Sequence, residues 1–559
     1  MFALKFKRIY PQDILVVIIF GALAYLPFLG RAYLFDWDEI NFAECAREML
    51  ISQNYFQVQI DFQPFWEKPP LFIWLQALCM KVLGINEFAA RLPNAIFGII
   101  TLVSLYVIGS KQRDKAFGFL WMGMFMSSVL PSVYFKSGII DPVFNYFIFC
   151  AIYQIIRIEQ ENRKSYTRAI YVGLFIGLAI LTKGPVGLLI PMLTFIVVRV
   201  YTLNFKLPWI SILVALVTMS GIVSIWVVLE IKAHGTKILE EFIAYQIRLF
   251  RTEDAGHGQP FFYHFIVFLL GCFPLSAFAL RGQFIKPIDR SEKYLHSYMN
   301  TLFWVVMILF SIVKTKIIHY SSLLYFPGSY AAAHYLYRIH ASASMHIKWD
   351  FYLVYGFGYI VFGTATTLIP FAASQTDFIQ SLIKDDFGKQ NVLMPVEWHW
   401  GIGLVGLVFL FGFGLSAWYY HRENVFKAVV TGMITMMIWL NFVNYFIVPK
   451  VQKYTQGPPV ELFIEKSKQN CYLDTWKYKS YAHYFYGKRS LDYPRRARDK
   501  EWLLKQQIDK PVFIVSKSHH SKELEEYCKG CTFLYKKGGF HIYSRVPNQQ
   551  RIYDKDKFF

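Results

Sequence analysis

Long runs of apolar residues dominate the chain, and only short polar segments separate most of them. A helix needs about 20 residues to cross the hydrocarbon core of a bilayer, and about thirteen runs approach that length. The pattern therefore predicts an α-helical polytopic membrane protein. We expect membrane spans near residues 13–30, 88–109, 116–134, 140–158, 169–182, 184–201, 208–230, 262–280, 297–313, 318–337, 350–371, 398–419 and 425–447.

Two stretches depart from this pattern. Most of 31–87 is too polar to span, and apolar positions at helix spacing in NFAECAREML (41–50) predict an amphipathic helix lying on the membrane surface. Residues 450–559 are polar and mixed, with strand-like runs at 511–517 and 540–546. We expect a transmembrane domain over 1–449 and a small soluble α/β domain over 450–559.

Composition agrees with a membrane protein. Of 559 residues, 55% are hydrophobic, 19% aromatic and only 17% charged, which is less charge than soluble chains carry. The formal net charge of +20 raises the question of nucleic-acid binding, but the cations are spread over short segments and form no basic domain. We therefore expect no nucleic-acid partner, and we interpret the charge as a topology signal with attraction to anionic lipid.

The basic residues fall on alternate loops. If the basic N-terminus leads from the cytoplasm into an uncleaved first span, these loops all lie inside, as the positive-inside rule requires. The opposite loops are longer or richer in acidic, His and aromatic residues, and an odd number of spans places 450–559 on their side. We expect a protein of the cell inner (plasma) membrane whose functional groups face outward. The loops on this predicted outer side are 31–87, 135–141, 231–261, 314–317 and 372–397.

Acidic residues gather directly after the first span, in FDWDEINFAECAREML (35–50). Charge so close to hydrocarbon costs free energy, which favours a functional role for Asp38. The alternative is a solvated helix N-terminus, where carboxylates interact favourably with the helix dipole. This alternative is the better interpretation of Asp36 and Glu44.

The same loop continues with Glu67 and Lys68 beside two prolines in QPFWEKPPLFIWL (63–75). A carboxylate can ligate a divalent metal and a lysine can hold a phosphate as a point charge, while an interfacial ion pair is the alternative. In the loop 231–261, His257 lies between two glycines and is a candidate metal ligand. Arg251 is a candidate bidentate partner for phosphate oxygens.

Asp141 begins a span in KSGIIDPVFNYF (136–147). It is either a helix cap, which the following proline supports, or a functional acid near the first acidic loop. Lys183 lies on the same predicted side, in the tight turn LTKGPVG (181–187). Both are therefore candidates for one outer site.

A short turn in FSIVKTKIIHYSSLLYFP (310–327) carries several polar groups on the outer face. For one of the two lysines, Lys314 and Lys316, the simpler explanation is a side chain that snorkels from a helix end to the membrane surface. The turn projects its other groups toward an outer vestibule, where a lipid phosphate would lie. These candidates are Lys314, Lys316, His319 and Tyr320.

Cys528 and Cys531 form a CKGC motif near the C-terminus. Without a second CxxC pair the motif supports a zinc site only weakly, although His519 and His520 are near. A disulfide, or a pairing with Cys471, is at least as well supported on the outer side of a membrane.

Taken in order, five of these motifs resemble a known superfamily: the Asp-Glu pair after the first span, the AREML helix, EKPP, the IDP at a span start and FSIVKTKIIHYSSLLYFP. They resemble the multi-spanning glycosyltransferases that use lipid-phosphate sugars (the GT-C type), in particular bacterial aminoarabinose transferases acting on lipid A and protein O-mannosyltransferases. The resemblance runs through roughly the first 330 residues. It fixes neither the sugar nor the acceptor.

The resemblance implies an inverting transfer from a polyprenyl-phosphate-linked donor to a lipid A, other glycan or protein acceptor. Asp38 would be the general base, with Glu39 beside it and Asp141 as a second acidic site residue. Glu67 and His257 would match the family's metal-binding positions, so a divalent metal ion is the cofactor that the resemblance implies. The groups that would hold the lipid phosphate are Lys68, Arg251, Lys316 and Tyr320.

The chain departs from the family pattern in two places. The His and Arg spacing of the 240–260 loop does not align with the family's, and Ile317 and Ile318 follow Lys316 where the family often has a proline. The first departure bears on the roles of Arg251 and His257.

A lipid or sugar transporter or flippase is the main alternative function. Transporters keep functional charges near the bilayer midplane, often in broken helices of internal repeats, whereas the candidate charges here lie in outer loops. A membrane scaffold or receptor is a third class, and it predicts that Asp38 is dispensable. Asp36-Trp37-Asp38 resembles the metal-binding acids of nucleotide-sugar transferases, but nucleotide sugars are cytoplasmic and this loop is predicted to face outward.

Overall fold

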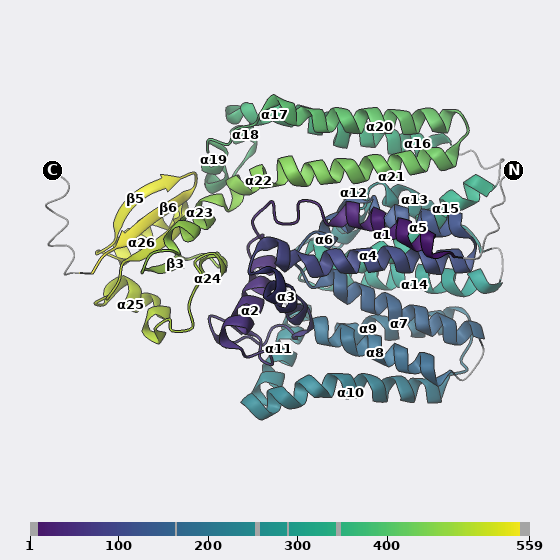
Figure 1. Ribbon diagram of the computed structural model, residues 1–559, viewed down its shortest axis with the longest axis horizontal. Helices are drawn as coiled ribbons and strands as arrows, with labels where there is room; N and C mark the ends of the chain where they lie inside the picture. The colour runs from purple at the N-terminus through teal and green to yellow at the C-terminus, as the bar shows by residue number, and fades with distance from the viewer. Residues whose placement is uncertain (1–8, 162–164, 252–257, 288–289, 342–347, 548–559) are drawn as a thin grey trace.

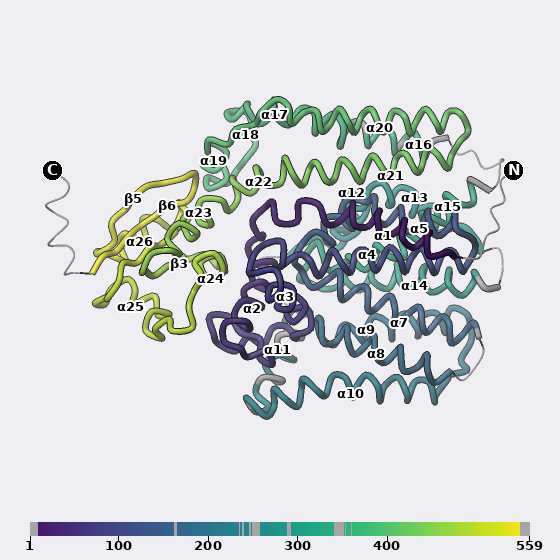
Figure 2. Tube along the Cα trace, in the orientation of Figure 1, coloured from purple at the N-terminus to yellow at the C-terminus, as the bar shows by residue number. Residues whose placement is uncertain are grey.

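The computed structural model describes residues 9–161, 165–251, 258–287, 290–341 and 348–547. Long helices run side by side along the longest axis, and a small sheet lies beyond one end of them (Figure 1). The Cα trace shows the same division, with helices α2 and α3 lying between the long helices and the C-terminal sheet (Figure 2). The polar segment after the first helix is therefore enclosed at one end of the bundle.

The bundle contains a helix at every predicted span. Its first helices are α1 Pro11–Tyr25, α4 Glu87–Gln112, α5 Lys115–Met126, α6 Val129–Phe135, α7 Asp141–Glu161, α8 Tyr166–Lys183, α9 Val186–Tyr201 and α10 Trp209–His234. They are followed by α11 Lys237–Arg251, α12 Tyr263–Gly271, α13 Leu275–Gly282, α14 Arg290–Ile312, η1 Ile318–Leu324 and α15 Tyr325–Ala341. The last group is α16 Lys348–Phe357, η2 Gly358–Thr364, α17 Ala365–Ser374, α18 Thr376–Leu382, α19 Asp386–Val392, η3 Trp400–Gly403, α20 Leu404–His421, α21 Val425–Phe442 and η4 Val443–Ile447.

Fewer of these helices are long and apolar enough to cross a membrane than the sequence predicts. In the described part of the chain, 7 helices meet that description, or up to 9 if two bent pairs each form one span. The bent pairs are α5 with α6, at 75°, and α12 with α13, at 117°. A multi-spanning protein is confirmed, while the count of about thirteen spans is not, because several predicted spans correspond to short or broken helices.

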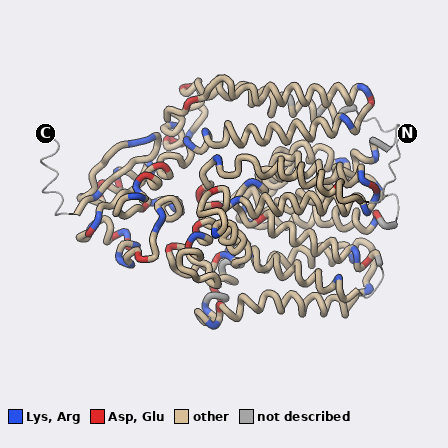
Figure 3. The backbone as a smooth tube through the Cα atoms, in the orientation of Figure 1, with Lys and Arg blue, Asp and Glu red and all other residues tan. Residues whose placement is uncertain are grey.

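Charge is distributed as a membrane protein requires. Lys, Arg, Asp and Glu gather at the two ends of the helices and over the C-terminal part, and they are sparse along the middle (Figure 3). Exposed apolar side chains continue along outward-facing helices such as α10, where Leu213 and Val217 are among the exposed residues. Such a band is costly in water and stable in lipid.

The predicted surface helix is wrong in its environment. Helix α2, Asp38–Ser52, has the predicted position, but residues 39–49 are all buried. The short strands β1 Gln59–Ile60 and β2 Gln63–Pro64 and helix α3, Leu71–Leu83, complete this segment. The C-terminal part covers α2: a guanidinium nitrogen of Arg47 donates a hydrogen bond to the backbone oxygen of Arg489, at 2.8 Å. Long-range packing, which periodicity does not reveal, buries both faces of α2.

Beyond the last long helix, α22 Val448–Thr455 and α23 Gly457–Lys466 lead into a four-stranded sheet. Its order is β3-β4-β6-β5, with β3 parallel to β4 and the other pairs antiparallel. The strands are β3 Tyr472–Trp476, β4 Val512–Lys517, β5 Thr532–Lys537 and β6 Phe540–Arg545, and the helices are α24 Ala482–Phe485, η5 Arg495–Arg498, α25 Lys500–Lys505, η6 Ser518–His520 and α26 Ser521–Tyr527. The predicted strands near 511–517 and 540–546 are confirmed.

Two further predictions concern this C-terminal part. Cys528 and Cys531 form a disulfide, and Cys471 carries a free thiol, so the disulfide within the CKGC motif is the correct alternative. The predicted boundary at residue 449 falls inside α22. The division into a transmembrane and a soluble domain stays a prediction.

Candidate active site

Asp38 is the first residue of α2, at the end of the bundle that faces the C-terminal sheet. The preceding residue, Trp37, has a positive φ of 80°, a conformation that side-chain-bearing residues rarely adopt. Such backbone strain persists only where surrounding contacts enforce it, and it is concentrated at functional sites. The strained turn leaves the Asp38 carboxylate partly accessible, with 39% of its side chain exposed.

His319 lies between the two acids that the sequence singles out. Its Nε2 atom is 3.5 Å from the Asp38 Oδ2 atom and 3.9 Å from the Asp141 Oδ2 atom. His319 belongs to η1, which follows α14, whereas Asp141 begins α7. Three segments that are distant in sequence therefore bring Asp38, Asp141 and His319 together, as the predicted common side requires.

Asp141 is buried and forms an ion pair with Lys183, at the C-terminal end of α8. The Lys183 ammonium also lies over the Tyr320 ring, 4.8 Å from its centroid. Helix α7 positions the acid, because Asp141 and Pro142 begin the helix where backbone N–H groups lack intrahelical partners. A cation, an imidazole and a phenol thus lie together beside Asp38.

Glu39 has a different environment from its neighbour Asp38. It is buried, and its two carboxylate oxygens accept hydrogen bonds from Nε and a terminal nitrogen of Arg91, each at 2.8 Å. The backbone N–H groups of Phe35 and Gly138 donate to the same carboxylate. Its lone pairs are occupied by these bonds, so the structure places Glu39 as a support for the loop between α1 and α2.

Asp36 binds the C-terminal part of the chain. Its carboxylate accepts a hydrogen bond from the backbone N–H of Tyr481, at 3.1 Å, and its own backbone N–H donates to the Gln456 side chain, at 2.9 Å. Burial raises the pKa of Asp36. The Lys479 ammonium lies 5.3 Å from the centroid of the Trp37 ring. The C-terminal part therefore holds the turn that presents Asp38.

Further along α2, a buried polar cluster fixes the helix. Arg47 donates two hydrogen bonds to Glu44, at 2.7 and 2.6 Å. Glu48 accepts the backbone N–H groups of Asp61 and Phe62, both at 2.7 Å. Burial and the neighbouring Glu44 carboxylate raise the pKa of Glu48 to about 9. The predicted solvated helix N-terminus is wrong for Glu44, because its carboxylate is buried and paired with Arg47.

The predicted phosphate-binding lysines approach this site from two sides. Lys68 lies within electrostatic range of His319. Lys316 is buried directly before η1, and it makes no ion pair with any residue in the described ranges. The structure thus brings Lys68, Lys316 and Tyr320 to the same end of the bundle as Asp38. Together with Lys183, they supply positive charge and a hydroxyl beside one accessible carboxylate.

Comparison with known proteins gives matches in both sequence and fold. Residues 67–226 match the family model described as dolichyl-phosphate-mannose-protein mannosyltransferase. The chain is 26% identical over 328 residues to undecaprenyl phosphate-alpha-4-amino-4-deoxy-L-arabinose arabinosyl transferase 1 of Proteus mirabilis (strain HI4320). It is 25% identical over 400 residues to transferase 2 of that organism, with 70% of this chain and 69% of that protein aligned. The first alignment spans 58% of this chain and 59% of that relative's length.

The fold comparison extends over nearly the whole chain. The crystal structure of ArnT from Cupriavidus metallidurans bound to undecaprenyl phosphate superposes with a TM-score of 0.73 at 15% identity, covering 96% of this chain and 98% of that one. Its apo state gives a TM-score of 0.72. The predicted resemblance to multi-spanning glycosyltransferases is confirmed. At this identity the likeness to ArnT establishes the shared fold alone.

The predicted metal site includes a residue that lies outside the described ranges. Within those ranges no group of three or more His, Cys, Asp and Glu side chains is arranged to hold a metal ion. Glu67 is described, whereas His257 lies outside the described residues, as does the side chain of Arg251 at the end of α11. The assignments of Glu67, His257 and Arg251 in this glycosyltransferase-like chain therefore stay predictions.

Several residues that shape the site were not singled out by the sequence. Arg91 follows the start of a predicted span, and a charge at that depth is costly enough to have been a signal. Trp37 carries no signal of this kind, because a positive φ at a non-glycine residue cannot be inferred from the residue type. Gln456 and the backbone of Tyr481 carry no such signal either, since they lie 420 and 445 residues from Asp36 in the sequence.

Proposed function

We propose that this chain is a glycosyltransferase that moves a sugar from a polyprenyl-phosphate donor to an acceptor, with inversion at the anomeric carbon. One observation carries the proposal: Asp38 is a partly exposed carboxylate, 3.5 Å from His319, in a cluster with the Lys183 ammonium. A base beside cations fits a reaction in which an acceptor loses a proton while a phosphate gains negative charge. The names of the curated relatives support a polyprenyl-phosphate donor.

In the proposed reaction, the acceptor oxygen forms a bond to the anomeric carbon as the bond from that carbon to the phosphate oxygen breaks. Asp38 takes the acceptor's proton, and the lipid phosphate leaves with the bonding electron pair. A positioned general base of this kind contributes roughly 100- to 10,000-fold to a rate. Attack opposite the leaving phosphate inverts the configuration.

The leaving phosphate needs positive charge at a fixed place. Asp141 holds the Lys183 ammonium by a buried ion pair, and the Tyr320 ring lies beneath that ammonium. We therefore assign Asp141 as a positioning residue for Lys183 and His319, and Lys183 as a phosphate-binding group. Lys68 and Lys316 add two further positive charges. Their attraction for the phosphate is stronger in a site that excludes water.

The proposal also covers a metal ion and the side of the membrane. A carboxylate such as Glu67 would suit a divalent metal, which would supply additional positive charge to the phosphate. The basic loops at the opposite end of the bundle support an extracytoplasmic location of Asp38. The proposed acceptor is lipid A, another glycan or a protein hydroxyl.

The test is a transfer assay with the full chain reconstituted in lipid vesicles. The vesicles contain a polyprenyl-phosphate sugar labelled in the sugar, and lipid A or an unfolded secreted protein is added as acceptor. We expect free polyprenyl phosphate and labelled acceptor to form in equal amounts. Movement of intact donor between leaflets, with no cleavage of the sugar–phosphate bond, would instead identify a flippase and refute the proposal.

A further inference from the structure

A cavity lies between α9 and α14, and its polar wall is remote from Asp38. Its volume is about 720 Å³, and its walls are the C-terminal half of α9, residues 283–287 and α14. The polar wall lies near the N-terminal end of α14, whereas Lys316 and His319 follow the C-terminal end of the same helix. At 1.5 Å per residue, α14 separates the two sites by roughly 30 Å. We call this cavity the α9–α14 groove.

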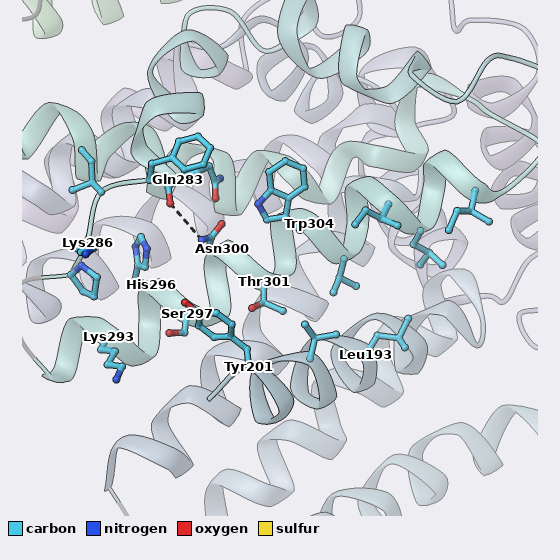
Figure 4. A pocket seen from close by; sticks show the side chains of 18 residues that line it. Leu193, Tyr201, Gln283, Lys286, Lys293, His296, Ser297, Asn300, Thr301 and Trp304 are labelled. Atoms are coloured by element: carbon cyan, nitrogen blue, oxygen red, sulfur yellow. Dashed lines mark hydrogen bonds between the residues drawn. The ribbon is translucent and has the colours of Figure 1, made fainter. Parts of the chain in front are cut away.

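The polar end of the groove contains hydrogen-bonding atoms that have no partner among the described residues. Gln283 is 6% exposed, yet neither its amide nitrogen nor its amide oxygen is hydrogen-bonded. The Asn300 side-chain oxygen and the His296 Nδ1 atom are also buried and also have no hydrogen-bond partner among the described residues. Figure 4 shows these side chains around the cavity, with the Asn300 amide donating to the Gln283 backbone oxygen at 3.5 Å. Buried polar atoms are nearly always satisfied, so this set fits a polar ligand group.

Two lysines give this end of the groove a positive charge. Lys286 and Lys293 are exposed at its rim, and neither has an ion-pair partner among the described residues. Among the described residues the adjacent acid is Glu292, which is buried and paired with Arg113, so its charge does not cancel theirs. Unpaired ammonium groups beside orphaned amides fit an anionic group that also carries hydrogen-bonding oxygens.

The other end of the groove is apolar. Trp304, Ile308 and Ile312 follow one another along α14 at helix spacing, and all three are exposed. Leu193 and Val197 of α9 face them across the cavity. The groove therefore changes from charged to apolar along the direction of the bundle, which is the polarity of a membrane lipid lying beside a helix.

We propose that the α9–α14 groove binds an anionic glycerophospholipid of the leaflet opposite Asp38. The lipid phosphate contacts Lys286 and Lys293, and the glycerol and ester oxygens bond to the Gln283 and Asn300 amides. An acyl chain lies along Trp304, Ile308 and Ile312. The positive-inside rule predicts that this end of the bundle is cytoplasmic, where anionic lipid attracts basic groups near the surface.

The test is retention of lipid by the purified full chain in mild detergent. Phosphatidylglycerol, phosphatidylcholine or polyprenyl phosphate is added at equal concentration, and bound lipid is counted by native mass spectrometry. We expect one tightly held phosphatidylglycerol in place of phosphatidylcholine. The double variant Lys286→Ala/Lys293→Ala weakens its binding by roughly 25-fold, because each lysine beside an anionic lipid contributes a factor of about five.

Two further variants separate the groove from general surface charge. Arg422→Ala/Lys427→Ala removes two cations from another loop at the same predicted side and leaves retention unchanged. Thr301→Trp fills the cavity without altering charge, and it abolishes retention while the chain still elutes as a folded species. Equal retention by wild type and the Lys286/Lys293 variant, or equal retention of phosphatidylcholine, would overturn the proposal. Displacement of phosphatidylglycerol by stoichiometric polyprenyl phosphate would also overturn it.

Discussion

Replacing Asp38 with asparagine is the sharpest perturbation of the proposed reaction. Asparagine has nearly the same size and keeps a polar side chain at the start of α2, but it cannot accept the acceptor's proton. Loss of a general base lowers kcat by 100- to 10,000-fold, or about 3 to 5.5 kcal/mol in the activation barrier. Donor KM changes little, because the proposed phosphate contacts come from lysines. The contact with His319 contributes little to stability, since 39% of the Asp38 side chain is exposed.

The assay is the release of free polyprenyl phosphate from reconstituted vesicles, with donor concentration varied so that kcat and KM are separated. Asp36→Asn is the matched control: it removes one carboxylate from the same turn, and its remaining amide oxygen can still accept the Tyr481 N–H. We expect the control to keep activity within tenfold of wild type. Thermal unfolding midpoints of both variants verify that the fold is intact.

Two outcomes would refute this reasoning. A well-folded Asp38→Asn variant with kcat within tenfold of wild type would show that Asp38 is not the base. An equal loss in Asp36→Asn would show that both acids act through the shape of the turn. In either case the partly exposed carboxylate would no longer identify the reacting group.

Three other predictions concern buried or partly buried charged residues. Lys183→Met and Lys316→Ala each raise donor KM at least tenfold in the same vesicle assay, because a phosphate contact is lost; an unchanged KM removes that lysine from the phosphate site. Arg91→Met leaves the buried Glu39 charge unpaired and destabilises the chain by about 3 to 5 kcal/mol, measured by denaturation in detergent; a smaller loss contradicts the buried pair. The folded chain keeps a proton on Glu48 that the unfolded chain releases, so stability falls as pH rises from 5 to 8, by at most about 1.4 kcal/mol per unit. Glu48→Gln flattens this slope in thermal scans, and an unchanged slope contradicts the raised pKa.

Much of the site was predictable because membrane topology restricts where charged loops can lie. Charge alternation along the chain assigns Asp38, Asp141 and Lys316 to one side before any contact is known. The structure then places Asp38 and Asp141 against the same imidazole, at 3.5 and 3.9 Å. Every second loop of such a bundle lies on the same side of the membrane. Two residues in loops of the same side are therefore near each other much more often than two residues chosen at random from the sequence.

The environment of α2 could not be predicted in the same way. Its apolar periodicity is that of a helix with one exposed face, yet residues 39–49 are buried on all sides. Helix α3 packs against α2 from the same loop, and the C-terminal part covers it through α24 and the Arg489 backbone oxygen, which accepts from Arg47. Amphipathic patterning reports where apolar groups lie on a helix, and it does not report a polar face that is buried against hydrogen-bonding partners.

The acids of the first loop illustrate what structure adds to residue type. Asp36 accepts a backbone N–H, Glu39 is bonded to both arms of Arg91, and Glu44 is bonded to Arg47. Glu39 and Glu44 are poor bases, because taking a proton would break an ion pair with a buried guanidinium. Asp38 alone of the four combines partial exposure with an imidazole neighbour. The choice of base therefore rests on which carboxylate its surroundings leave able to accept a proton, and the surroundings are contributed by segments up to 445 residues away.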